Sequence, residues 1–201
     1  MVRTAETKSS ATNAVDLLMA DHEAVKKLFG AYKKLMKKNA DGAEKQAVTS
    51  QICQALTVHA QIEEEIFYPA VREVLDDQAL IDEALVEHAT CKDLIAQLKE
   101  ASPDDDYYDA KVTVLGEYID HHVAEEEGEM FKLAKKMKVD FMALGEELLA
   151  RQEELKREID GDEEPGDEKR GSRSTMKNSA RGRASGGARP AASHSRSRES
   201  T

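Results

Sequence analysis

The sequence predicts an all-α protein: an up-down bundle of four long helices, a short extra C-terminal helix and a disordered tail. Apolar residues recur at spacings of three and four over most of residues 13–160, which is the period of one helix face. Runs of β-branched residues bounded by Gly and Pro, which favour strands, are missing. Residues 161–201 contain no Leu, Ile, Val or aromatic residue, so they offer little to a core. We therefore expect a disordered N-terminus over 1–12, a bundle over 13–160 and a disordered Arg/Ser/Gly-rich tail over 161–201.

The first two helices are expected at about 13–40 and 43–75, separated by turn chemistry at Asp41-Gly42. Pro69 lies inside the second run and should kink it or mark its last full turn. The apolar face of the first helix carries one histidine, and that of the second carries a histidine and a glutamate. These faces comprise Val15, Leu18, His22, Val25 and Phe29 in the first run, and Ile52, Leu56, His59, Ile62, Glu63 and Ile66 in the second.

Three further helices are expected at about 78–100, 102–138 and 141–159. Ser102 is suited to the N-cap of the fourth helix, with Pro103 at its first position. The fifth is shorter, with Leu144, Leu148 and Leu155 on its apolar side. The third helix should bury one face made of Ile81, Leu85, His88, Cys91, Ile95 and Leu98.

The bundle contains an internal repeat. In each half, a helix with one histidine precedes a helix with His-x-x-x-Glu: His22 then His59 and Glu63, and His88 then His122 and Glu126. The separations between the two histidines, 37 and 34 residues, are similar. Such a duplication gives a bundle a pseudo-twofold axis, on which a two-metal site would naturally lie.

The second motif contains two adjacent histidines, and two observations favour His122 over His121. His122 and Glu126 interrupt a core stripe that contains Leu115, Ile119, Met130 and Leu133. The stripe of His121 and Glu125 continues to Gly128 and Lys132 and so runs toward solvent. The alignment of the two halves makes the same choice.

Six inward-facing residues therefore need a chemical explanation. A carboxylate facing a core without a partner costs several kcal/mol. A His and a Glu at i and i+4 lie one turn apart and can reach one metal, and bundle cores are known hosts for carboxylate-bridged di-iron sites. The alternatives are ordinary ones: a lone inward His is more often a core residue than a ligand. Glutamate runs are usually solvated, so only one residue is chosen from each of 63–65 and 125–127. Cys91, Tyr68 and Tyr118 are expected to serve in packing.

These residues resemble the hemerythrin HHE cation-binding family. The resemblance rests on LLMADH (17–22), HAQIEEEIFYP (59–69), EH (87–88) and HHVAEEEGEMF (121–131), and covers about 13–150. It implies a non-haem di-iron centre that meets dioxygen, nitric oxide or peroxide, with zinc or manganese able to replace iron. The matching ligand positions are His22, His59, Glu63, His88, His122 and Glu126, with the two glutamates as bridges. Four His and two Glu are similar to the set in bacterial iron-centre repair proteins, whereas oxygen carriers use a fifth His and an aspartate.

The main part of the chain and its C-terminal tail have net charges of opposite sign. Residues 1–168 carry 20 Lys/Arg against 39 Asp/Glu, a balance of −19, and residues 169–201 carry 9 against 1, a balance of +8. An acidic body repels phosphates, which argues against nucleic-acid binding by the bundle. We expect the tail to act mainly as a solubilising segment, with weak binding of nucleic acid or of an acidic partner as the alternative. It lacks aromatic residues for stacking on bases. No apolar run approaches ~18 residues, and the N-terminus lacks a secretory core, so a cytoplasmic protein without membrane contact is expected.

Three functions fit these expectations. The first is a metal-binding sensor, scavenger or iron-handling protein for oxygen and nitrogen species, without enzymatic turnover. The second is a di-iron redox enzyme that decomposes peroxide or acts as a ferritin-like oxidase. The third is an interaction module acting through its basic tail. The sequence leaves the oligomeric state open.

Overall fold

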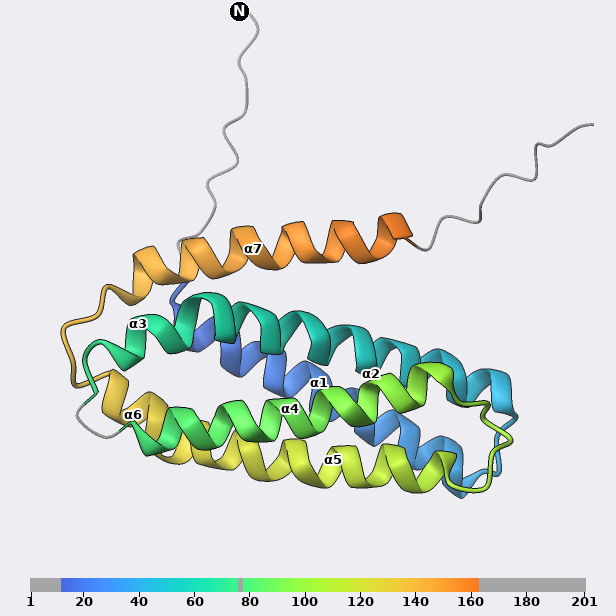
Figure 1. Ribbon diagram of the computed structural model, residues 1–201. Helices are drawn as coiled ribbons and strands as arrows, with labels where there is room; N and C mark the ends of the chain where they lie inside the picture. The colour runs from blue at the N-terminus through green and yellow to red at the C-terminus, as the bar shows by residue number, and fades with distance from the viewer. Residues whose placement is uncertain (1–11, 76–77, 163–201) are drawn as a thin grey trace, which may run out of the picture. The chain divides into compact units, whose positions relative to one another are not determined.

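The computed structural model describes residues 12–75 and 78–162, and within these ranges every regular element is a helix. Four long helices alternate in direction and form the bundle: α1 (Ala14–Lys37), α2 (Gly42–Ile62), α4 (Ala79–Glu100) and α5 (Tyr108–Glu125) (Figure 1). The all-α, up-down arrangement predicted from the sequence is confirmed. The expected disordered segments lie outside the described residues, except for Thr12 and for Gly161 and Asp162, which belong to the last helix.

The first two helices begin where cap chemistry places them. Asn13 accepts a hydrogen bond from the backbone N–H of Val15 at 3.0 Å, and Asp41 accepts one from Glu44 at 2.9 Å. Each side-chain oxygen satisfies a backbone donor that has no partner inside the helix. These caps fix the entry of α1 and α2 into the bundle.

The predicted start of the fourth helix at Ser102 is wrong, because α5 begins at Tyr108. The Ser102 hydroxyl caps a turn, accepting from the N–H of Asp104 at 3.3 Å, while its own N–H donates to Asp105 Oδ2 at 3.0 Å. Short acidic side chains compete in this way with helical backbone bonds. The helix therefore starts later, beyond the aspartate run.

Both predicted motif helices contain a wider π-helical turn that the sequence did not reveal. The first, η1 (Glu63–Phe67), joins α2 to α3 (Tyr68–Arg72), and the second, η2 (Glu126–Met130), joins α5 to α6 (Phe131–Ala134). The extra residue shifts the inward face, so Phe67 is buried where Ile66 was expected, and Ala134 where Leu133 was expected. The two turns occupy matching positions in the two halves. Turns of this kind are common at functional sites.

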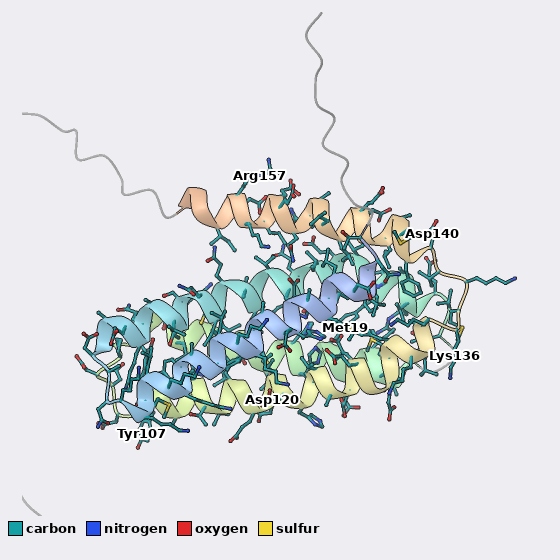
Figure 2. The ribbon with its side chains drawn as sticks, turned by 180° about the vertical axis from the view of Figure 1, so that it is seen from behind. Met19, Tyr107, Asp120, Lys136, Asp140 and Arg157 are labelled. Atoms are coloured by element: carbon teal, nitrogen blue, oxygen red, sulfur yellow. The ribbon has the colours of Figure 1, made fainter. Side chains whose placement is uncertain are left out.

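The third helix buries Ala84 (3% exposed) where the sequence suggested Leu85, which is 37% exposed. Residues 81, 84, 88, 91, 95 and 98 then form a regular 3-4-3-4-3 stripe. Figure 2 shows the charged side chains of Asp120 and Arg157 on the outside, while the long helices enclose the core.

The last helix, α7 (Phe141–Asp162), is as long as α4 and ends beyond the expected residue 159. It packs along α1 and α2 and buries Leu144, Leu148 and Leu155 against them (Figure 1). Gly145 permits the close approach, because a Cβ there would lie 1.8 Å from the carbonyl oxygen of Thr12. The helix is thus docked on the outside of the four-helix core.

Candidate metal centre

The six residues singled out in the sequence all lie in the interior. Each long helix of the bundle contributes one histidine, and each glutamate is the first residue of a π-helical turn. All are less than a tenth exposed: His22, His59, Glu63, His88, His122 and Glu126.

The four histidines form two pairs, each within one half of the repeat. Nε2 of His22 lies 3.1 Å from Nε2 of His59, and Nε2 of His88 lies 3.1 Å from Nε2 of His122. In both pairs the Nε2 atoms point inward. Each pair therefore presents two imidazole nitrogens to one point.

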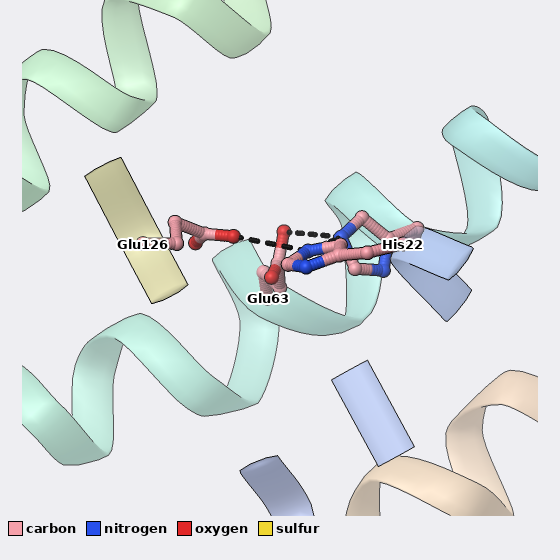
Figure 3. Close-up of side chains that lie close together, drawn as sticks. His22, Glu63 and Glu126 are labelled. Atoms are coloured by element: carbon pink, nitrogen blue, oxygen red, sulfur yellow. Dashed lines mark hydrogen bonds and ion pairs between the residues drawn. The ribbon is translucent and has the colours of Figure 1, made fainter. Parts of the chain in front are cut away.

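The two glutamates connect the pairs. Glu63 Oε2 lies 3.3 Å from His59 Nε2 and 3.4 Å from His88 Nε2. Glu126 Oε2 lies 3.2 Å from His22 Nε2 (Figure 3). The same oxygen lies 3.5 Å from His122 Nε2. Each carboxylate oxygen thus lies beside one histidine of each half.

The outer nitrogen of every inward histidine faces a carboxylate from another helix. The Nδ1–O distances are 2.9 Å for His22 with Glu127, 3.5 Å for His59 with Asp21, 2.9 Å for His88 with Glu64 and 2.8 Å for His122 with Glu87. A carboxylate at 2.8–2.9 Å keeps the proton on Nδ1 of His22, His88 and His122, so their Nε2 atoms remain available as electron-pair donors toward the interior. The contact of His59 with Asp21 is longer, and His59 Nδ1 makes no hydrogen bond among the described residues. The imidazole rings are therefore oriented as metal ligands would be.

Sequence reasoning missed these four outer carboxylates, since it assigned the remaining glutamates of the runs to the surface. A repeated signal marks them. An acidic residue directly precedes the first histidine of each half, and another directly follows each inward glutamate. Those positions are Asp21, Glu87, Glu64 and Glu127.

Tyr68 also belongs to the site, although packing alone was expected for it. Its hydroxyl donates to Glu126 Oε1 at 2.8 Å and lies 3.4 Å from His88 Nε2. The matching residue of the other half is Phe131, whose ring stacks on His22 at a centroid distance of 5.9 Å. Tyr118, by contrast, is an exposed residue.

The two inward carboxyls have opposite pKa shifts. Burial raises the pKa of Glu63 well above its usual range, and the charge of Glu126 adds to this. Glu126 is buried as well, but the hydrogen bond from His22 and the charge of His122 outweigh burial and lower its pKa. In the metal-free protein, therefore, the ionised form is favoured for Glu126 and disfavoured for Glu63.

The pKa values of the inward histidines are also shifted in opposite directions. Burial opposes protonation of His22, yet its contacts with Glu126 and Glu127 outweigh burial and raise its pKa. Burial lowers the pKa of His59, and it lowers that of His88 to about 4 with help from the neighbouring histidine charge. The negative charges of Glu126 and Glu127 thus favour the protonated form of His22.

The two adjacent histidines of the second motif differ in burial, in the direction that the helical wheel predicted. The side chain of His122 is 3% exposed, whereas that of His121 is 60% exposed. His121 lies 3.6 Å from Glu87 Oε1 and 3.3 Å from Glu125 Oε1, which makes a separate group at the surface.

A narrow cavity adjoins the histidines on the side away from the glutamates. All four inward imidazoles line it, and most of the remaining wall is apolar: Val25, Leu56, Ala60, Cys91, Ile95, Ile119 and Val123, with Lys92. Burial raises the pKa of the Cys91 thiol to about 11, so it stays neutral. About 20 Å³ is open to the centres of water-sized molecules. That is room for a water or a diatomic molecule beside the imidazoles.

The donor set fits metal ions. Two buried groups among the described residues have ligand atoms close enough to hold an ion: His22, His59, Glu63 and Glu126, and Glu63, His88 and His122. Among the described residues, Glu63 Oε1 is fully buried and accepts no hydrogen bond. A buried carboxyl oxygen without a partner is costly, and a cation would supply the missing interaction.

Comparison with known proteins agrees with this geometry. The family model of the hemerythrin HHE cation binding domain matches residues 13–134, more than half of the chain. This chain belongs to the hemerythrin HHE cation-binding domain family. A solved HHE domain-containing protein from Mycobacterium kansasii has the same fold, with a TM-score of 0.62 and 24% identity over 73% of this chain and 89% of that one.

A curated relative, a DNA nickase from Nostoc sp., is 34% identical over 122 residues. These residues are 59% of this chain and 32% of the relative, so the chain spans about a third of that protein's length. The matched family region ends at residue 134, and α7 of this HHE protein lies beyond it. In the described part of the chain, none of the helices combines the length and apolar character needed to cross a membrane.

Proposed function

We propose that this HHE protein holds two iron ions, one between each histidine pair, with Glu63 and Glu126 bridging them. One observation carries the proposal: an oxygen of each glutamate lies within 3.5 Å of one histidine from each pair. A residue that served a single ion would not need to lie between two pairs. Four-helix bundles build carboxylate-bridged two-metal sites from this plan.

The donor chemistry favours iron. Imidazole and carboxylate ligands suit ferrous and ferric ions, although zinc and manganese compete for the same atoms. Once bound, iron would supply exchangeable coordination positions and a change of oxidation state. The surrounding residues would hold the ligands in place: the outer carboxylates orient the imidazoles, and Tyr68 donates a hydrogen bond to Glu126.

The cavity indicates which molecules the centre meets. It reaches the four imidazoles, is mostly apolar and has room for little more than two heavy atoms. Dioxygen, nitric oxide and peroxide meet these limits, and an apolar wall favours the uncharged gases. We therefore propose that the protein binds or responds to one of these species, or handles the iron itself.

The test is anaerobic reconstitution with ferrous iron, followed by stepwise addition of dioxygen, nitric oxide or peroxide. Absorption and Mössbauer spectra should change with about one equivalent of ligand per iron pair. Spectra that stay unchanged with all three species would contradict a ligand-binding centre.

A redox enzyme is the second candidate, and Tyr68 is the observation that favours it. Its hydroxyl is a proton donor in direct contact with one bridge, Glu126, and next to His88. Catalytic consumption of peroxide or ferrous iron by the reconstituted protein would favour the enzyme. A stoichiometric reaction that stops after one turnover would favour the sensor.

The nickase activity of the Nostoc relative is not carried over to the bundle. Residues 1–168 have a net charge of −19, which repels the phosphates of nucleic acid. The proposed metal-binding atoms are buried among helices, where a duplex cannot reach them. Weak binding of nucleic acid by the basic tail, over 169–201, stays a prediction because those residues lie outside the described ones.

A further inference from the structure

The helix beyond the matched family region contributes a buried polar residue next to the centre. Gln152 of α7 is 7% exposed, and its Nε2 donates to Asp21 Oδ2 at 2.7 Å. Lys156 donates to Gln152 Oε1 at 2.9 Å, which sets the amide orientation so that the N–H₂ faces Asp21. One side of α7 therefore has a defined polar contact with α1.

Asp21 is one of the four outer carboxylates, and it is the one with the longest contact. Its Oδ2 lies 3.5 Å from His59 Nδ1, whereas the other three carboxylates lie 2.8–2.9 Å from their histidines. Its side chain is 26% exposed, so the carboxylate has water available as an alternative partner. Gln152 binds the same oxygen, Oδ2, that lies nearest to His59 Nδ1, so this bond keeps the charge of Asp21 beside the His59 ring.

The corresponding carboxylates are fixed by other means. Glu64, which faces His88, accepts two hydrogen bonds from Lys92 of α4 at 2.5 and 2.7 Å. Glu87, which faces His122, lies beside His121. Contact with α7 thus distinguishes the His22–His59 pair from the His88–His122 pair.

We propose that Gln152 is a positioning residue: it holds Asp21 so that His59 keeps its proton on Nδ1 and directs Nε2 into the centre. Metal binding between His22 and His59 then depends on the docking of α7, which makes the two metal positions unequal. This inference rests on the proposed two-metal function.

The experiment compares Gln152→Leu and Gln152→Glu with Arg151→Ala. Leucine and glutamate keep the size of the side chain but remove the N–H donor. Arg151 lies next to Gln152 on α7 and binds Glu65 at 2.7 Å, away from the histidines, so its removal controls for loss of an α7 contact. Melting of each variant reports whether α7 packing is retained.

The first readout needs no metal. In the metal-free wild-type protein, nitrogen NMR shifts of His59 should show the Nδ1–H tautomer. Both Gln152 variants should shift it toward a mixture, whereas Arg151→Ala should match the wild type. An unchanged His59 tautomer in both Gln152 variants would overturn the proposal.

The second readout is stepwise titration with ferrous iron and with zinc. Each Gln152 variant should bind one of the two ions about 10-fold more weakly, because loss of an outer partner costs 10–100-fold in affinity. If the Gln152 variants bind both ions with the affinities of the wild type, the proposal is overturned. A wild-type protein that binds fewer than two ions contradicts the proposed function instead, and the NMR test of Gln152 still applies.

Discussion

The two halves of the bundle match at the candidate metal ligands and differ in what surrounds them. Each half supplies two histidines and a glutamate on the same helical plan, with a π-helical turn starting at the glutamate. Around this symmetric set, Tyr68 occupies the position that Phe131 has in the other half. The two carboxyls also have opposite pKa shifts: burial and the charge of Glu126 raise the pKa of Glu63, whereas the hydrogen bond from His22 and the charge of His122 outweigh burial and lower that of Glu126.

The largest expected effect separates a ligand from its neighbour. His122→Ala should lose iron and the near-ultraviolet charge-transfer bands, because it removes an inward imidazole. His121→Ala should keep both, since that side chain is mostly exposed. Iron per chain and absorption are measured after identical reconstitution. Loss of iron from His121→Ala alone would mean that the inward face of α5 has been misassigned.

A smaller effect is expected from the outer carboxylates. Glu127→Gln should weaken metal binding by about 10–100-fold, because His22 loses the acceptor that keeps its proton on Nδ1. Glu129, an exposed residue of the same π-helical turn, provides the control. Competition with a chelator measures the affinities. Equal affinities for Glu127→Gln and Glu129→Gln would show that Glu127 has no orienting role.

Tyr68→Phe makes the halves alike at this position. The ionised Glu126 loses a 2.8 Å hydrogen bond, which should destabilise the metal-free protein by roughly 2 kcal/mol. The pKa of Glu126 should rise, since its charged form has lost a donor. Urea unfolding and carboxyl NMR titration measure the two changes. An unchanged stability and pKa would show that the asymmetry has another origin.

The asymmetry also predicts a pH dependence for the metal-free protein. His59 and His88 have lowered pKa values, so below about pH 6.5 the unfolded chain takes up more protons and stability falls. His22 has a raised pKa, so the folded chain keeps a proton that the unfolded chain releases above about pH 6.5, and stability falls there. The raised pKa of Glu63 acts in the same direction from about pH 4.5 upward. Unfolding free energy should peak near pH 6.5. Bound metal should move the peak upward, because it must displace these protons.

The sequence predicted that the six candidate ligands face the interior because each of them repeats and each interrupts an apolar stripe. It could not predict the π-helical turns, since one inserted residue still leaves spacings of three and four on either side. Leu85 and Ala84 lie equally well between Ile81 and His88, and packing against neighbouring helices decides which is buried. The contact of Gln152 with Asp21 joins residues 131 positions apart, which no local pattern encodes.

The central claim is that both halves share one two-metal centre, and metal stoichiometry tests it most directly. The protein is reconstituted anaerobically with iron, freed of loosely bound ions and analysed for iron per chain together with its Mössbauer spectrum. The account predicts about two iron ions per chain, magnetically coupled after oxidation. One ion per chain, or two uncoupled ions, would contradict a centre bridged by Glu63 and Glu126.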